Sequence, residues 1–211
     1  MPRRKSPLQS IYPYGITARS NNKEWFDVPL SDCWIIFSEV IQKTSERYGI
    51  RTHCFVLMSN HFHWLVSTPE SNLAEAMRYF MTETSRRIAR AGGRINKIYG
   101  ARYKWTLITE DSYYANTIRY FYQNPLRAKL CNDVDSYPWS TLSANSNIKL
   151  SPNLKFEQWI PADISELRKW LNRIPDGPYQ LMMQKALRRS EFRFPPHPSS
   201  KRPLNELSFL D

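Results

Sequence analysis

The chain has 211 residues and a formal net charge of +11, with a sequence pI of about 9.7. Its length indicates one domain with an appendage, and it has neither an apolar run near the roughly 20 residues of a membrane span nor a signal-peptide pattern. Three widely spaced cysteines form no CxxC pair, which fits a reducing cytoplasm. Together with the lack of a long apolar run, this leads us to expect a cytoplasmic protein without membrane contact. The basic excess favours a polyanionic partner, with nucleic acid as the default candidate. A simple surplus of surface lysine is the weaker alternative, because arginine outnumbers lysine and is the better phosphate ligand.

The first part of the chain predicts a strand, a helix and a hairpin. Apolar and polar residues alternate over residues 12–18, which is typical of a strand. Residues 33–48 place apolar side chains at near-helical spacing, and Gly49 is suited to end that helix. Residues 51–58 and 61–67 are two β-rich runs separated by only two residues, which predicts a hairpin.

The next part predicts a long helix, a strand and two shorter helices. Residues 73–91 have an apolar face and are followed by two glycines, and residues 102–109 predict a further strand. A helix over residues 110–123 must end near Asn124, because a proline disfavours helical geometry in the residue before it. Pro125 then suits the first turn of a short new helix.

The order strand, helix, strand, strand, helix, strand matches the split βαβ plan. We therefore expect an α+β fold, a ferredoxin-like sandwich whose antiparallel sheet has helices on one face, with the third helix outside that unit. After residue 145 the composition changes, and two helices are expected within residues 164–174 and 179–190, followed by a proline-rich end. We predict a main domain over residues 1–145 and a C-terminal extension over residues 146–211.

Two of the four histidines, His61 and His63, lie two apart in the second run of the hairpin. Alternate residues of a strand face the same side, so both imidazoles project together and Phe62 points into the opposite layer. Paired imidazoles suit a divalent metal ion but fall one or two ligands short of a complete site. The simpler alternative is two polar residues on a solvated face. The apolar runs FVLM and WLV on both sides argue against it, because they indicate a covered strand.

A further ligand or reactive group is expected from the helix over residues 110–123. Tyr120 and Asn124 are four apart and share one helical face. Tyrosine is a competent covalent nucleophile, and the asparagine side chain offers a carbonyl oxygen that hard divalent cations accept. Periodicity alone favours Tyr120 as a core aromatic, and Asn124 can simply cap the helix that follows.

Three motifs in chain order carry a resemblance to a known family. LMSNHFHWLV at residues 57–66, RYFYQNPLRAKL at residues 119–130 and YPWSTL at residues 137–142 resemble the HUH single-strand transposases with one catalytic tyrosine. The branch they most resemble is the REP-associated tyrosine transposases. The resemblance covers residues 10–145, and the opening YGITARSNNKEWF also looks like the first strand and loop of that family. The tail does not align to the pattern.

The resemblance implies a metal-dependent enzyme, a transposase that cleaves and rejoins single-stranded DNA through a 5′-phosphotyrosine intermediate. It implies Tyr120 as the nucleophile and His61, His63 and Asn124 as ligands of Mg²⁺ or Mn²⁺, although relatives often have glutamine at the last position. It also implies hairpin DNA from palindromic repeats as the partner, and either a monomer or a homodimer. The alternative is a protein of the same fold that binds hairpin DNA but has no catalytic activity. A metal-dependent hydrolase that uses water as the nucleophile is a weaker alternative.

Basic residues follow the long helix and the loop after it. Between Ala76 and Trp105 they are interrupted by a single acidic residue, Glu83, and such a stripe favours contact with a phosphate backbone. The predicted DNA-binding residues are Arg78, Arg86, Arg87, Arg90, Arg94, Lys97, Arg102 and Lys104. Three aromatic residues that offer stacking faces to unpaired bases lie among them, namely Tyr99, Tyr103 and Trp105. For any one of these residues a solvated helix face or a core position is the simpler interpretation. The basic segments 1–5 and 186–193 are further candidates.

Overall fold

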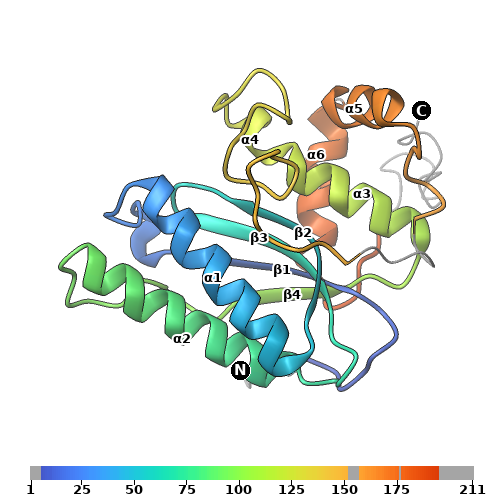
Figure 1. The fold of residues 1–211 in the computed structure, drawn as a ribbon. Helices are drawn as coiled ribbons and strands as arrows, with labels where there is room; N and C mark the ends of the chain where they lie inside the picture. Colours follow the sequence, from blue (N-terminus) through green and yellow to red (C-terminus); the bar gives the residue numbers. More distant parts are fainter. Residues whose placement is uncertain (1–5, 152–156, 176, 195–211) are drawn as a thin grey trace.

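The computed structural model describes residues 6–151, 157–175 and 177–194 (Figure 1). Its four-stranded antiparallel sheet has the order β2-β3-β1-β4. The strands are β1 (Tyr14–Arg19), β2 (Arg51–Leu57), β3 (His61–Ser67) and β4 (Lys104–Leu107). The helices are α1 (Leu30–Tyr48), α2 (Leu73–Ala91), α3 (Asp111–Tyr122), α4 (Asn124–Arg127), α5 (Ile164–Asn172) and α6 (Gly177–Ala186), with a short 3-10 helix, η1 (Asn21–Lys23). The strand order, with α1 and α2 as the two crossovers, confirms the predicted ferredoxin-like α+β class.

The crossover helices α1 and α2 lie side by side on one face of the sheet (Figure 1). Phe62 and Trp64 of β3 point to this face and pack against Phe80 of α2, with ring centroids 5.4 and 4.7 Å apart. Phe37 of α1 lies 5.7 Å from Phe62 and completes the aromatic centre of this layer. The strand alternation therefore buries Phe62 on the side predicted for it, and burial of these rings stabilises the pairing of sheet and helices.

The second face of the sheet is covered by α3 and by the C-terminal helices, so helices lie on both faces and not on one face alone as predicted. Cys54, Val56 and Leu65 point to this face and are fully buried, and apolar strand residues of this kind need a second layer over them. Trp170 of α5 and Met183 of α6 belong to the same apolar cluster. The extension thus shares a core with α3, and the predicted division between residues 145 and 146 stays a prediction.

The chain after α6 returns to the free edge of the sheet. The amide of Leu107 donates to the carbonyl of Ser190, and the amide of Phe192 donates to the carbonyl of Leu107, both at 2.8 Å. Residues 190–192 of the basic segment 186–193 pair with this edge, whereas the basic segment 1–5 and the prolines from residue 195 onward lie outside the described residues. Within the described part of the chain, every helix is too short or too polar to cross a membrane.

Candidate active site

His61 and His63 project from β3 toward α3, on the face opposite to Phe62. Their ring centroids are 5.1 Å apart and the ring planes are inclined by 82°, so the two imidazoles converge as the strand alternation predicts. His63 is 8% exposed beneath α3, whereas His61 lies at the open end of the strand and is partly exposed. A ligand can therefore approach the pair from the side of His61.

Asn60 fixes the orientation of the His61 ring. The Asn60 Nδ2 donates to the carbonyl of Lys23 at 2.7 Å, so its Oδ1 is the atom that lies 2.7 Å from Nδ1 of His61. An amide oxygen can only accept, which means that Nδ1 of His61 carries the proton. The lone pair of His61 is consequently on Nε2, and this nitrogen is available to a metal ion.

The environment keeps both imidazoles neutral. Burial lowers the pKa of His61 to about 4, with Arg19 adding to the effect. Burial also lowers the pKa of His63 well below its ordinary value, helped by His61 and Arg19. Nδ1 of His63 is buried and has no hydrogen-bond partner among the described residues. Neutral imidazoles are the form that binds a metal ion, and an unpaired buried nitrogen is expected where a ligand completes the site.

Tyr120 lies next to His63, with ring centroids 6.3 Å apart, and is 5% exposed. Burial raises the pKa of its phenol. Arg127, a hydrogen bond with Gln184 and, to a smaller extent, Arg188 and Arg19 oppose this rise. The phenol is therefore protonated at neutral pH, but surrounding positive charge stabilises the phenolate once the proton leaves.

Arg127 and Arg19 are functional candidates that we did not predict from the sequence. The guanidinium carbon of Arg127 lies 4.8 Å from the centroid of the Tyr120 ring. Its Nη2 donates to Gln123, whereas Nε and Nη1 are buried without a partner among the described residues. Arg19 lies directly opposite His61 across β1 and β3 and so shares the face of the histidines. Arg127 belongs to the second sequence motif, which was the available signal for it.

Asn124 is the first residue of α4 and is separated from the end of α3 by one residue. Its side-chain Nδ2 donates to the carbonyl of Tyr120 at 2.8 Å. Its Oδ1 remains for another partner. Within the described residues, no group of three histidine, cysteine, aspartate or glutamate side chains could hold a metal ion, so a third ligand from this part of the chain would be of another type. Among the described residues, the Tyr120 ring lies beside that of His63, whereas Asn124 has no hydrogen bond with either histidine. Its role as the third ligand stays a prediction.

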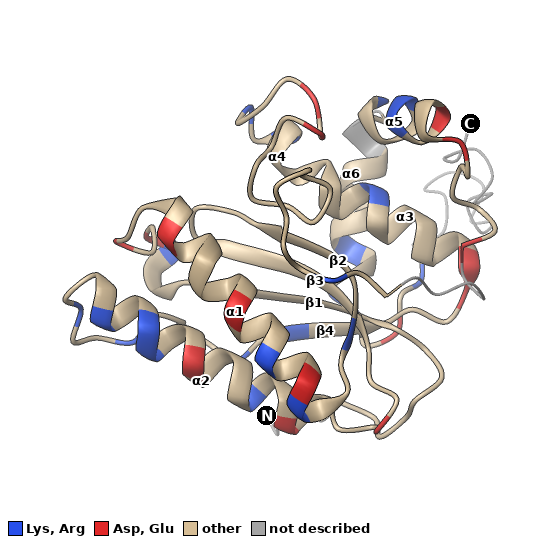
Figure 2. Cartoon of the chain, viewed as in Figure 1, with Lys and Arg blue, Asp and Glu red and all other residues tan. Residues whose placement is uncertain are grey.

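The basic stripe follows α2, which covers the face of the sheet opposite to Tyr120 (Figure 2). Three of its members are held in ion pairs with acidic neighbours, namely Arg86, Arg87 and Arg94. Lys104 lies on the face of Tyr120, because it pairs with Thr17 and Thr17 pairs with His63. Exposed ion pairs are weak and can give way to phosphates, so the DNA-binding role of the stripe stays a prediction.

Comparison with known proteins gives one family and two informative relatives. Residues 22–124 match the family model described as "Transposase IS200 like". A Haemophilus influenzae protein that bears the name of a REP-associated tyrosine transposase is 24% identical over 168 residues, which cover 74% of this chain and 91% of that protein. The structure of a REP-associated tyrosine transposase bound to a REP hairpin has a TM-score of 0.57 at 19% identity, covering 67% of this chain and 82% of that one, and supports the fold. These matches confirm the resemblance that the three motifs predict.

Proposed function

We propose that this chain, which carries an IS200-like transposase domain at residues 22–124, is a metal-dependent transposase that cleaves and rejoins single-stranded DNA. The observation that supports this most directly is the approach of the Tyr120 phenol to the paired imidazoles, with 6.3 Å between the rings of Tyr120 and His63. The REP hairpin in the structural neighbour and the name of the Haemophilus influenzae relative lead us to assign hairpin DNA from palindromic repeats as the substrate.

A divalent ion, Mg²⁺ or Mn²⁺, is the cofactor that fits the donor set. His61 would bind it through Nε2, His63 through its unpaired ring nitrogen and Asn124 through Oδ1. When bound, it would supply positive charge against the oxygens of the scissile phosphate. Two imidazole ligands favour Mn²⁺ over Mg²⁺, which prefers oxygen ligands.

The chain's own residues account for the covalent step. The Tyr120 hydroxyl loses its proton and its oxygen attacks phosphorus, forming a phosphotyrosine ester, while the bond from phosphorus to the 3′ oxygen breaks and that oxygen takes up a proton. Arg127 and Arg19 would stabilise the phenolate and the phosphate, because their positive charge already opposes the rise in the Tyr120 pKa. The ester conserves the energy of the broken bond, so another 3′ hydroxyl can reverse the step without ATP.

Trapping the covalent product tests this proposal. Hairpin DNA with single-stranded flanks, incubated with the protein and Mn²⁺, should yield a protein–DNA adduct on a denaturing gel, with the 5′ phosphate mapped to Tyr120 by mass spectrometry. Tyr120→Phe should abolish the adduct. Tyr122→Phe is the matched control, because Tyr122 lies on the same helix but bonds to Thr141 instead. We expect it to retain the adduct.

The alternatives predict different outcomes in the same assay. A hairpin-binding protein without chemistry would bind the DNA but give neither cleavage nor adduct with the wild-type chain. If the protein is a hydrolase that activates water at the histidines, the Tyr120→Phe variant should still cleave the DNA and the His61→Ala variant should not. Cleavage by Tyr120→Phe at the wild-type rate would therefore overturn the assignment of the nucleophile.

A further inference from the structure

A cavity of about 510 Å³ lies on the side of the sheet opposite to Tyr120, between α2 and the segment that leads into β4. Its volume falls within the range of small-molecule sites. The apolar and charged side chains that line it are Met77, Met81, Tyr103, Arg78, Arg102 and Glu75. Nothing in the covalent chemistry of Tyr120 uses these residues.

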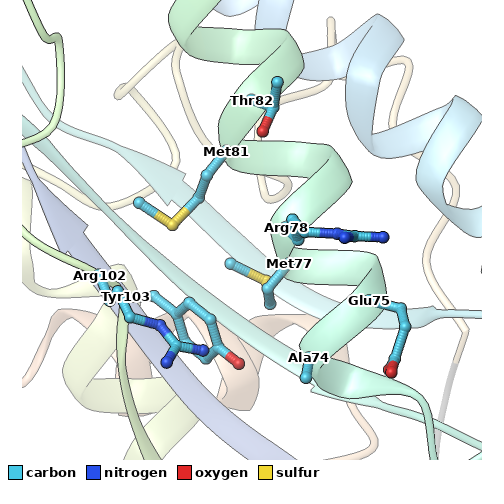
Figure 3. Close-up of a pocket in the computed structure, with 8 residues that line it drawn as sticks. All are labelled: Ala74, Glu75, Met77, Arg78, Met81, Thr82, Arg102 and Tyr103. Carbon is cyan, nitrogen blue, oxygen red and sulfur yellow. The ribbon is translucent and has the colours of Figure 1, made fainter. Parts of the chain in front are cut away.

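The lining combines an apolar slot with a positively charged rim. Figure 3 shows Met77 and Met81 extending from α2 toward the side on which Arg102 and Tyr103 lie. The guanidinium carbon of Arg102 is 6.0 Å from the centroid of the Tyr103 ring, so a flat cation and an aromatic ring stand together. Thioethers and aromatic rings contact planar groups favourably, and the rim holds two guanidinium groups against the single carboxylate of Glu75. A planar group that carries negative charge, as a nucleotide does, fits this chemistry.

The cavity is also close to the active face along the sheet. Tyr103 directly precedes Lys104, and Lys104, Thr17 and His63 lie in register across β4, β1 and β3. Neighbouring strands are about 4.8 Å apart, so Lys104 and His63 are separated by about 10 Å across the sheet. A single strand that leaves the histidines can therefore reach the β4 edge within a few nucleotides and turn around it into the cavity.

We propose that this cavity binds one unpaired nucleotide of the substrate strand. The base lies between Met81 and Tyr103, and its flanking phosphate lies against Arg78 and Arg102. The inference rests on the proposed function and adds a position at which the single strand is held away from the nick. It commits to a nucleotide, because a nucleotide offers both a flat base for Met81 and Tyr103 and a phosphate for the two guanidinium groups.

Abasic substitution combined with a tyrosine variant tests the cavity. Single-stranded flanks of a hairpin are given one abasic site at a time, and the Kd for the full-length chain is measured at fixed salt. At one flank position the wild-type chain should lose about tenfold in affinity, which lies within the range expected for the stacking of one base on an aromatic ring. Tyr103→Leu should lose a similar factor with intact DNA and should lose nothing further at that same abasic position.

The matched control is Tyr79→Leu. Tyr79 is also a half-buried tyrosine on this face, with the guanidinium carbon of Arg47 5.2 Å from its ring, but it lies outside the cavity. The Tyr79→Leu variant should keep the full loss of affinity at the abasic position. Melting temperatures show whether either variant is destabilised. If Tyr103→Leu keeps the full abasic effect at every flank position while the Tyr120 adduct still forms, the cavity does not hold a nucleotide and only this inference fails. If hairpin DNA neither binds nor forms the adduct, the proposed function fails and the cavity inference fails with it.

Discussion

Replacing Asn60 with alanine tests whether the fold orients His61 for the proposed metal ion. Asn60 accepts the Nδ1 proton of His61 and donates to the carbonyl of Lys23, each at 2.7 Å, and alanine removes both bonds. Loss of a group that orients a metal-binding histidine typically weakens metal affinity by about 10- to 100-fold. That factor corresponds to about 1.4 to 2.7 kcal/mol of binding free energy. The two hydrogen bonds contribute only about 1 kcal/mol each to folding, so the variant should remain folded.

The assay is the Kd for Mn²⁺, measured by electron paramagnetic resonance of the free ion. Asn60→Asp should fall between wild type and Asn60→Ala, because it keeps an acceptor for His61 but loses the donor to Lys23. Ser59→Ala is the neighbouring control, since Ser59 contributes its backbone carbonyl to the amide of Phe26 and alanine retains that bond. The reasoning is refuted if Asn60→Ala binds Mn²⁺ as tightly as wild type under conditions in which His61→Ala does not bind it.

Three further predictions concern the nucleophile, the sheet and pH. Arg127 lowers the pKa of the Tyr120 phenol, so Arg127→Gln should shift the pH profile of adduct formation to higher pH, and an unshifted profile would contradict the assigned role. A Cβ on Gly15 would lie 3.2 Å from Cγ2 of Thr106. Gly15→Val should therefore lower the free energy of unfolding by about 1 to 3 kcal/mol in urea titrations, and Gly15→Ala should lower it by less. Equal stability of the wild type and both variants would argue against a tight contact. Burial lowers the pKa of His53 from 6.5 to about 4, so its contribution to stability is complete above pH 6.5 and declines as the pH falls toward 4. The full pKa shift corresponds to about 3 kcal/mol of unfolding free energy. His53→Gln should therefore reduce the loss of unfolding free energy between pH 6.5 and pH 4.

The fold of the main domain was predictable because its signals are local. Alternation in β1 and β3, the apolar spacing in α1 and the breaks at Gly49 and Pro125 each act within a few residues, and together they leave one simple topology. The same locality put the two histidines on one side of a strand. It also put Tyr120 on a helix that follows the sheet.

The second layer could not be predicted, because its contacts join residues that are far apart in the sequence. Asn116 and Arg119 are buried in α3, where the Tyr179 hydroxyl donates to the Asn116 side chain and Arg119 donates to the carbonyl of Arg173. These partners are 63 and 54 residues away along the chain. A pattern of polar residues in a helix does not show that distant groups will pair with them.

The face of the sheet on which the basic stripe lies could not be predicted from the sequence for a related reason. Charge spacing shows that one helix side is cationic, but it does not show which face of the sheet that helix covers. Arg94 illustrates the gap, because it bonds to Glu24 and Asp27, which lie about 70 residues earlier in the chain. The charge pattern alone suggests an unpaired cation, whereas the structure pairs the Arg94 guanidinium with two carboxylates.

The strand-like contact of residues 190–192 with Leu107 has a consequence for reaction kinetics. This stretch of the β4 edge is already paired within the chain, and Tyr120 meets His63 of the same polypeptide. A second copy is then unnecessary for assembling the proposed reacting groups, and it could not extend the sheet there without first displacing the tail. We expect adduct formation to be first order in protein, with a rate per chain that stays constant on dilution.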